Sequence, residues 1–281
     1  MMRRLLKKIY YSIPGSPSST FLSNIDLKFR KLFSKKEVVV KRKGIWFKLN
    51  LDQMIDSSIF FNNYFEPETY YMFKKLIKPG NIIFDIGANV GAHAFYLAQL
   101  TGTNGKVYAF EPTEWAFNKF RCNMELNPEI RNITIERIAL SDKNNYDKKY
   151  SFRSQWKEGY PAEEENGRVD HQSLDTYCKK HHLQKVDFIK LDVDGYESKI
   201  IRGSKKILEK NRPIMIVEMG DYWQRAAGDS IEILVGMLDE VGYEYRTVEN
   251  LRPIDDIISH VKSFNEKNAA NIVCLPKEEI S

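Results

Sequence analysis

Two glycines and an acidic residue stand close together after an apolar run. Asp85 is the last residue but one of the run NIIFDI, Gly87 and Gly91 follow at a spacing of four, and Asn89 lies between them. Gly87 allows a sharp turn because glycine takes positive φ freely, and Gly91 leaves no side chain where a ligand or the first strand comes close. A helix that starts directly afterwards points its unpaired N–H groups into the same crevice. This stretch is therefore predicted to bind a small molecule.

Glu111 ends the next apolar run, YAFEP, twenty residues beyond Gly91. A carboxylate at this place in a doubly wound sheet accepts hydrogen bonds from both hydroxyls of a ribose. Asn89 replaces the middle glycine of the dinucleotide pattern, and the carboxylate of Asp85 would repel a pyrophosphate. A cationic nucleoside without phosphate, S-adenosylmethionine, is therefore favoured over NAD as the cofactor.

A second group of acids follows the predicted strand 186–193. Lys190, Asp192 and Asp194 alternate at a period of two, so they share one face of that strand. A hydroxyl that is to react as a nucleophile needs a base, or a metal ion that acidifies it. Asp192 and Glu218, at the ends of successive strands, are predicted to bind a divalent ion such as Mg²⁺ or to act directly on the acceptor. The strand of Asp192 ends beside the cofactor crevice, so Asp192 is also expected to contact the cofactor.

Other interpretations of these side chains stay open. Lys190, Asp194 and Glu197 are also consistent with capping the next helix and pairing with one another. His171 is a candidate base on the acceptor side. Aromatic side chains in loop-like stretches are candidates for a surface that stacks on a sugar ring. These residues are Trp156, Tyr160 and Trp223.

Strands and helices alternate along most of the chain, and this order must bring the two acidic groups together. The predicted strands span 81–86, 106–112, 133–140, 186–193, 213–219, 243–248 and 271–276. The predicted helices span 92–100, 114–127, 174–182, 198–210 and 229–242, and another begins at Glu66. This alternation predicts a doubly wound, mostly parallel α/β sheet with helices on both faces and ligands at the carboxyl ends of the strands. The last two strands lack a full helix between them, so one is expected to be antiparallel.

Two regions depart from this alternation. Residues 143–168 are polar and are predicted to be irregular, with an edge strand at 151–154. Residues 37–52 contain two β-rich runs around Lys43 and Gly44, which predicts a β-hairpin. Lys and Arg gather before residue 44 in a chain whose net charge is +5. Such a basic arm can contact nucleic acid or an anionic membrane surface, or can simply be a solvated end.

Cysteine usage and hydropathy indicate the cellular compartment of the protein. The chain has three cysteines, scattered and without a CxxC pair, so no zinc site is predicted. No apolar run approaches the roughly 18 residues of a membrane span, and the basic start is followed by too short an apolar stretch for a signal peptide. We therefore expect a reduced, cytoplasmic protein, whose oligomeric state the sequence does not indicate.

Several motifs together resemble the FkbM family of S-adenosylmethionine-dependent methyltransferases. The matching stretches are DIGANVG (85–91), FEP (110–112), ALSD (139–142), SLDTY (173–177), DFIKLDVDGYE (187–197), PIMIVE (213–218) and NIVCLP (271–276). The resemblance spans roughly residues 37–276. Asp194 stands where the family most often has Glu, and 143–168 is individual to this chain.

The resemblance implies a class I methyltransferase fold, Rossmann-like and seven-stranded, and methyl transfer to an oxygen of a sugar or a polyketide-derived hydroxyl. By position, Asp85, Gly87, Asn89 and Gly91 would hold the methionine part of the cofactor, and Glu111 with Pro112 the ribose. Ala139 and Leu140 would flank the adenine, with Ser141 or Asp142 at its amine. The chain is then expected to divide into a basic, partly flexible extension (1–36), a β-hairpin with its connector (37–64) and a methyltransferase domain (65–281).

The leading hypothesis is a methyltransferase that acts on a hydroxyl of a glycan or small metabolite. One alternative is a nucleic-acid methyltransferase, above all one acting on RNA, although no platform for base stacking is visible. An NAD-dependent oxidoreductase and a catalytically silent binding module are the others. Asp85 and Asn89 argue against the oxidoreductase. The acidic residues kept at the strand ends argue against the silent binding module.

Overall fold

A computed structural model describes residues 37–155, 163–264 and 268–277 of the chain. The predicted extension 1–36 lies outside these residues, as do Trp156 and Tyr160. Among the described residues, no helix is both long and apolar enough to cross a membrane.

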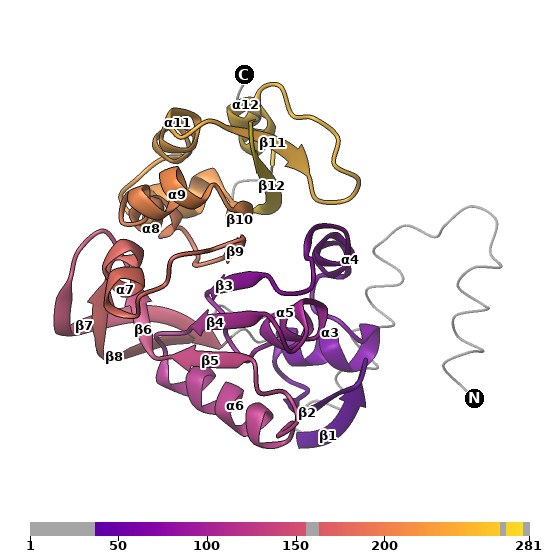
Figure 1. The fold of residues 1–281 in the computed structure, drawn as a ribbon. Helices are drawn as coiled ribbons and strands as arrows, with labels where there is room; N and C mark the ends of the chain where they lie inside the picture. Colours follow the sequence, from indigo (N-terminus) through magenta and orange to yellow (C-terminus); the bar gives the residue numbers. More distant parts are fainter. Residues whose placement is uncertain (1–36, 156–162, 265–267, 278–281) are drawn as a thin grey trace.

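A seven-stranded sheet forms the centre of the molecule (Figure 1), in the order β11-β12-β10-β9-β3-β4-β5. All neighbouring pairs are parallel except those of β12, which runs antiparallel to both β10 and β11. This confirms the predicted fold class and the expected antiparallel strand. The strands are β3 (Ile82–Ile86), β4 (Lys106–Phe110), β5 (Ile133–Glu136), β9 (Phe188–Leu191), β10 (Ile214–Met219), β11 (Tyr243–Thr247) and β12 (Ala270–Pro276).

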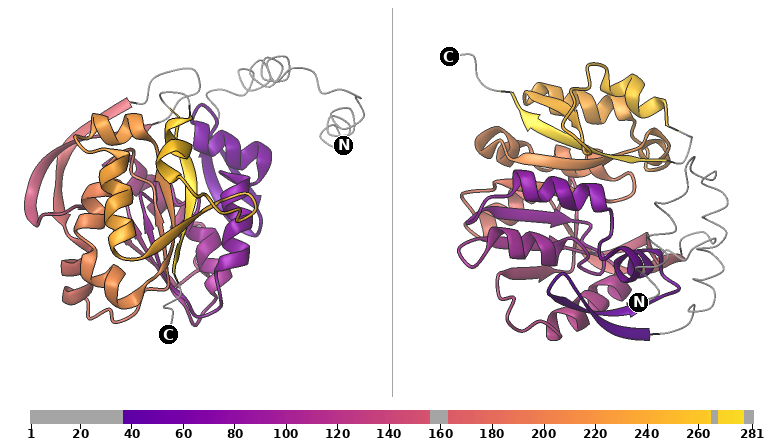
Figure 2. Two further views of the ribbon diagram at one scale, coloured as in Figure 1. Left: turned by 90° about the horizontal axis from the view of Figure 1, so that it is seen from above. Right: turned by 90° about the vertical axis from the view of Figure 1, so that its right-hand side faces the viewer.

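Helices cover both faces of this sheet (Figure 2), which explains why its central strands are apolar on both sides. Ile83 packs into the hydrophobic cluster on one face, and its neighbour Phe84 packs into the cluster on the other. The first face is covered by α3 (Met54–Asn62), α4 (Pro67–Leu76), α5 (Ala94–Thr101) and α6 (Glu114–Glu125). The second is covered by α7 (Leu174–Lys180), α8 (Glu197–Arg202), α9 (Lys205–Asn211), α11 (Ile231–Glu240) and α12 (Ile257–Lys262).

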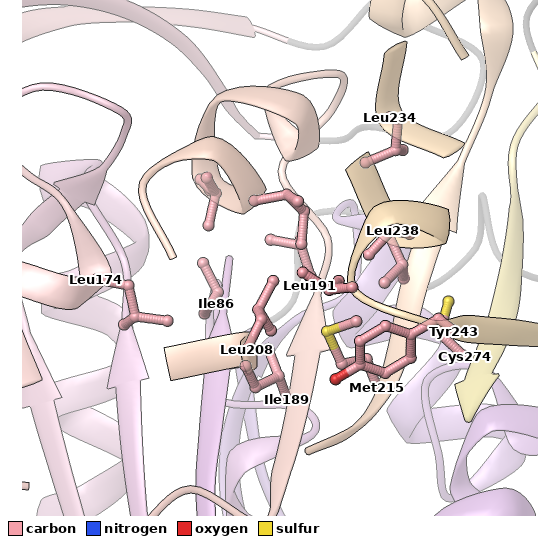
Figure 3. Packing of buried hydrophobic residues seen from close by; sticks show 14 of the residues in the cluster. Ile86, Leu174, Ile189, Leu191, Leu208, Met215, Leu234, Leu238, Tyr243 and Cys274 are labelled. Atoms are coloured by element: carbon pink, nitrogen blue, oxygen red, sulfur yellow. The ribbon is translucent and has the colours of Figure 1, made fainter. Parts of the chain in front are cut away.

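The second face holds the cluster drawn in Figure 3, where Leu191 and Met215 of neighbouring strands meet Leu208 and Leu238 of the covering helices. All four side chains are at most 1% exposed. Burial of such side chains contributes about 1.5–3 kcal/mol each. The cluster therefore fixes the positions of β9 and β10, whose carboxyl ends carry Asp192 and Glu218.

The predicted hairpin is confirmed as β1 (Glu37–Arg42) and β2 (Ile45–Asn50). Lys43 and Gly44 both have positive φ, 49° and 89°, as a tight two-residue hairpin turn requires. Three alternate side chains of β2 are fully buried and belong to the same cluster as α5. One of them, Phe47, meets Phe95 edge-on with ring centroids 5.6 Å apart.

The segment 143–168 was expected to be irregular apart from an edge strand at 151–154. That edge strand is confirmed as part of β7 (Asn145–Gln155), but the expected irregularity is wrong for the described residues. β7 pairs antiparallel with β8 (Glu163–Gln172) in the β7–β8 hairpin, and β8 pairs in parallel with the short β6 (Ile138–Leu140). The expected strand 133–140 is accordingly divided between β5 and β6. Both faces of the hairpin are largely exposed, so its sequence lacks the apolar alternation by which strands are recognised.

Helix boundaries also differ from the prediction. The expected helix at 198–210 is two helices, α8 and α9, interrupted at Gly203. A Cβ at Gly203 would lie 2.2 Å from the carbonyl oxygen of Ser141, so the backbone of this break packs directly on the end of β6. Three helices were not predicted, namely α3, α10 (Asp221–Ala226) and α12.

Candidate active site

A cavity of about 1030 Å³ opens at the carboxyl ends of the parallel strands. Its wall includes the glycine turn after β3, Glu111 after β4, the end of β6, and the acids that follow β9 and end β10. The β7–β8 hairpin and α10 complete it. Ligand cavities usually measure about 300–1,000 Å³, so this one has room for a cofactor and an acceptor together.

The glycine turn is built by positive φ at Gly87 (85°), Asn89 (48°) and Gly91 (85°). A Cβ at Gly87 would lie 1.7 Å from the carbonyl oxygen of Asp192, so the missing side chain lets β9 end against the turn. A Cβ at Gly91 would lie 2.5 Å from the ring of Phe120. Gly91 thus makes room for α6 and does not line the cavity, whereas Gly87 and Asn89 do.

The carboxylate of Glu111 is held in one orientation by three hydrogen bonds. Its Oε1 accepts from the backbone N (2.8 Å) and Oγ1 (2.5 Å) of Thr113, and its Oε2 accepts from the backbone N of Asn89 (2.9 Å). Burial raises the pKa of Glu111 to about 7, although these hydrogen bonds oppose the shift. Glu111 and Pro112 line the cavity. The two bonds from Thr113 occupy Oε1, whereas Oε2 keeps a free lone pair with which to accept from a ligand hydroxyl.

Asp85 lies behind the cavity wall and does not line it. Its side chain is 1% exposed, and its Oδ2 has no hydrogen-bond partner. Burial raises its pKa to about 6, against the opposing effects of the charges on His93 and Lys190. Asp85 can therefore influence a ligand in the cavity, through its charge above all, without being part of the cavity wall.

The end of β6 forms the wall where the adenine was expected. Ala139 and Leu140 are 5% and 7% exposed and line the cavity, followed by Ser141 and Asp142. Oγ of Ser141 donates to Oδ1 of Asp142 at 3.2 Å. An apolar floor with two polar side chains at its end suits a flat heterocycle that carries an amino group.

Three carboxylates that line the cavity meet beside the glycine turn. One oxygen each of Glu66, Asp192 and Glu218 lies within 4.8 Å of the other two. Burial, and then the charges of Asp192 and Asp194, raise the pKa of Glu218 well above its usual value. We refer to Glu66, Asp192 and Glu218 as the acid cluster.

Lys190 lies underneath the acid cluster and does not line the cavity. Its side chain is fully buried, and Nζ donates to Oδ2 of Asp192 and to Oδ1 of Asn271, both at 2.9 Å. Burial opposes its charge, but Asp192, Glu66 and Glu218 more than compensate and raise its pKa. Lys190 is therefore a fixed cation that positions the cluster without touching a ligand.

Glu66 was not among the site residues predicted from the sequence, where it only marked the start of a helix. It precedes α4 with a φ of 48°, and its Oε2 accepts from Nδ2 of Asn271 (2.8 Å) and contacts Nε2 of His93 (3.2 Å). Burial alone would raise its pKa, but His93 and Lys190 lower it to about 2. Glu66 is distant from Asp192 in the sequence, so no local pattern could have indicated their contact.

The acids after Asp192 have different roles. Glu197 is 1% exposed, and its Oε1 accepts from the backbone N of Val193 (3.0 Å) and of Gly195 (3.3 Å). This agrees with the structural interpretation, because Glu197 shapes the turn at the start of α8. Asp194 lines the cavity, and burial followed by the charge of Asp192 raises its pKa to about 8.

His171 lines the cavity away from the acid cluster. It pairs with Ala139 in the β6–β8 register, and its buried Nε2 has no hydrogen-bond partner. Burial lowers its pKa, and the charges that act on it most are those of Lys148 and Asp170. The structure therefore does not bring His171 together with Asp192 and Glu218.

Aromatic side chains of β7, α8 and α10 border the cavity. Phe152 and Tyr196 meet edge-on at 5.5 Å, and the guanidinium of Arg153 lies 4.5 Å from the ring centre of Trp223. Phe152, Tyr196 and Trp223 all line the cavity. Trp223 is the one of the three expected stacking residues that lies among the described residues, whereas Phe152 and Tyr196 were not predicted.

Comparisons with known proteins agree with this site. A family model described as the methyltransferase FkbM domain matches residues 85–245, which is more than half of the chain. The 2-O-methyltransferase NoeI of Sinorhizobium fredii is 30% identical over 158 residues, which cover 49% of this chain and 63% of NoeI. The match thus spans less than two thirds of that relative's length.

Two solved structures of other methyltransferases are similar to this chain. An S-adenosylmethionine-dependent O-methyltransferase from Thermotoga maritima is 16% identical, covers 89% of this chain and 82% of its own, and has a TM-score of 0.45. Fibrillarin of Aeropyrum pernix with bound S-adenosylmethionine is 13% identical, covers 85% of this chain and 83% of its own, and has a TM-score of 0.44.

The family match favours methyl transfer over the oxidoreductase and the silent binding module. It includes the glycine turn, Glu111, Asp192 and Glu218. From the match over residues 85–245, together with the motifs and the fold, the chain belongs to the FkbM family of methyltransferases.

Proposed function

We propose that this protein transfers a methyl group from S-adenosylmethionine to a hydroxyl of a glycan or small metabolite. The observation that carries this proposal is that one cavity is lined by two chemically different groups of residues. We call the glycine turn with Glu111 the cofactor end of the cavity, and the acid cluster, which adjoins the turn at Gly87, the acceptor end. Family membership supports the reaction type, and the named activity of NoeI supports oxygen as the acceptor atom.

The cofactor is proposed to lie along the glycine turn and the end of β6. Glu111 accepts the ribose hydroxyls, and the wall at Ala139 and Leu140 contacts the adenine. Oδ1 of Asn89 is buried without a hydrogen-bond partner and is available to the methionine part. The buried charge of Asp85 favours a cationic ligand over an anionic one. Gly91 contributes indirectly, through the packing of α6 under the turn.

The acceptor hydroxyl is proposed to lie beside Asp192 and Glu218. Its oxygen attacks the methyl carbon in line with the sulfonium, a C–O bond forms, and the C–S bond breaks with its electron pair going to sulfur. The hydroxyl proton passes to the carboxylate of Asp192. If a divalent ion binds, Asp192 and Glu218 would hold it, and it would lower the pKa of the hydroxyl. S-adenosylhomocysteine and the methyl ether are the products. Lys190 keeps Asp192 in place, and His171 remains a proposed second base at the adenine side.

A sugar-like acceptor is supported by the aromatic part of the cavity wall. Phe152, Tyr196 and Trp223 present aromatic surface to the cavity. Aromatic faces pack on the C–H faces of sugar rings, while carboxylates accept hydrogen bonds from sugar hydroxyls.

The free thiols of Cys178 and Cys274 are buried, which supports the proposed cytoplasmic location. We also propose that the basic residues 1–36 contact a membrane surface peripherally. The chain is further proposed to divide after residues 36 and 64 into the extension, the hairpin with its connector and the methyltransferase domain.

The test is incubation of the purified protein with S-adenosylmethionine labelled at its methyl group and with fractionated glycans, lipids and RNA of the host cell. We expect the label in an alkali-stable methyl ether of the glycan or small-metabolite fraction. Label in RNA would instead establish the nucleic-acid alternative. The absence of S-adenosylhomocysteine binding in a calorimetric titration, with binding of NADH, would contradict the proposal.

A further inference from the structure

The acid cluster unites three parts of the chain that are distant in sequence. Glu66 comes from the segment before α4, Asp192 follows β9, and Glu218 lies in β10. One oxygen from each lies within 4.8 Å of the others. Glu66 lies outside residues 85–245, so the family match does not include it. Three convergent carboxylate oxygens are the type of ligand that hard divalent cations prefer.

The fixed charges around the cluster do not balance. When ionised, Glu66, Asp192 and Glu218 carry three negative charges, and the buried Lys190 supplies one positive charge. The cluster then has an excess of negative charge, which a divalent cation offsets. Like charges this close together on half-buried side chains repel one another, so a ligand of opposite charge stabilises the site.

A separate observation points to a missing group beside the cluster. Asp85 is paired in register with Lys190 on the neighbouring strand, so both side chains rise from the same face of the sheet toward Asp192. Asp85 is 1% exposed, its Oδ2 has no hydrogen-bond partner, and the charges of Asp192 and Glu66 act on it. A water molecule on a bound cation would supply the donor that Oδ2 lacks.

Two of the three carboxylates, Glu66 and Asp192, are also held from behind, as metal ligands are. Asn271 donates to Glu66 through Nδ2 and accepts from Lys190 through Oδ1, and Lys190 also donates to Asp192, so one amide links the two sides of the cluster. His93 contacts the same Oε2 of Glu66 at 3.2 Å. These contacts fix the directions of Glu66 and Asp192 before a ligand arrives.

We propose that Glu66, Asp192 and Glu218 bind one hard divalent cation of the Mg²⁺ or Mn²⁺ class. The cation's remaining positions are filled by water and by the acceptor oxygen. This inference rests on the proposed function, because the ion lies where the acceptor hydroxyl is placed. A bound ion lowers the pKa of a hydroxyl that coordinates it, and so prepares that hydroxyl for methylation.

The test is binding of Mn²⁺ to the chelator-treated full chain, followed by electron paramagnetic resonance, with Mg²⁺ as competitor. We expect one Mn²⁺ per chain, displaced by Mg²⁺. Glu66→Gln and Glu218→Gln should each weaken Mn²⁺ binding at least about tenfold. Glu68→Gln, an exposed acid on α4, is the matched control and should bind Mn²⁺ like the wild type.

Calorimetry with S-adenosylhomocysteine on the same samples reports whether each variant is folded and separates the two proposals. We expect Glu66→Gln to bind S-adenosylhomocysteine like the wild type. Wild type that binds S-adenosylhomocysteine but no Mn²⁺, or Glu66→Gln that keeps full Mn²⁺ affinity, would overturn the metal site and leave the proposed function standing. Mn²⁺ binding without any S-adenosylhomocysteine binding would support the metal site and overturn the proposed cofactor.

Discussion

The two ends of the cavity are built in different ways. At the cofactor end, Gly87, Asn89 and Glu111 follow two adjacent parallel strands and are joined by a direct hydrogen bond between Asn89 and Glu111. At the acceptor end, Glu66, Asp192 and Glu218 come from three distant segments and depend on Lys190 below them. The first end is a local turn supported by backbone donors, whereas the second is an assembly of like charges that depends on the whole fold.

This difference predicts that substitutions at the two ends will separate binding from chemistry. Asp192→Asn should produce the largest effect on the chemical step. It removes a negative charge beside the acceptor, and loss of a positioned base typically costs about 10²–10⁴ in rate. We expect kcat to fall by that factor, with the affinity for S-adenosylhomocysteine changed less than about tenfold. Single-turnover methyl transfer and calorimetry measure the two quantities, and an Asp192→Asn enzyme with full kcat would remove Asp192 from the reaction.

Gly87→Ala should disrupt both ends together, because this glycine is where they touch. Its Cβ would lie 1.7 Å from the carbonyl oxygen of Asp192, and the residue has a φ of 85°. We expect a loss of about 1–3 kcal/mol of unfolding free energy and of cofactor binding. Gly80→Ala is the matched control, since Gly80 has a φ of 86° but no atom within 4 Å of its Cβ. Equal effects of the two substitutions in chemical denaturation would show that only the turn's φ matters.

The acceptor end should also affect the pH dependence of stability. The pKa of Asp194 is raised to about 8 in the folded protein, so the folded state holds a proton that the unfolded state has released. Its contribution to stability is full below the unfolded pKa and is lost as pH rises through about 8. Between these limits the wild-type unfolding free energy should fall with pH by up to about 1.4 kcal/mol per unit on account of this group.

Asp194→Asn should flatten that slope, measured by urea denaturation of the ligand-free protein from pH 5 to pH 8.5. Glu68→Gln again provides the comparison, as its side chain is exposed on α4. A slope that is the same in Asp194→Asn and in the wild type would show that Asp194 is ionised in the folded protein.

The smallest effect is expected at the aromatic wall. Trp223→Ala should raise the KM for the acceptor about tenfold, corresponding to about 1.4 kcal/mol, while kcat and cofactor affinity stay within a factor of about two. Trp46→Ala, a 40%-exposed tryptophan on the hairpin, should change none of these. A fall in kcat without a change in KM would place Trp223 in the chemical step.

The cofactor end could be predicted from the sequence because its residues follow strand ends at fixed spacing. Asp85 and Gly91 show the limit of that reasoning, since spacing located them in the turn but did not reveal that one lies behind the wall and the other packs on Phe120. The seven-stranded sheet was predictable for the same reason, because buried parallel strands are strongly apolar. The acid cluster was predicted only in part, since Glu66 reaches Asp192 through the tertiary fold alone.

Of the β7–β8 hairpin only the edge strand at 151–154 was predicted, and the rest was missed for a different physical reason. Its strands expose most side chains on both faces, and only a few positions such as Tyr150 and Val169 are buried. Backbone pairing then stabilises strands that carry no apolar alternation. Tyr150 also covers Gly167, whose Cβ would lie 2.8 Å from the ring, a contact between strands that no local pattern shows.

The claim that the cavity has a cofactor end and a separate acceptor end is tested most directly by titrating S-adenosylhomocysteine into wild type, Glu111→Ala and Glu218→Gln in a calorimeter. Binding of one molecule per chain to the wild type, its loss in Glu111→Ala and its retention in Glu218→Gln are the predicted results. Full affinity in Glu111→Ala, or an equal loss in both variants, would contradict the account.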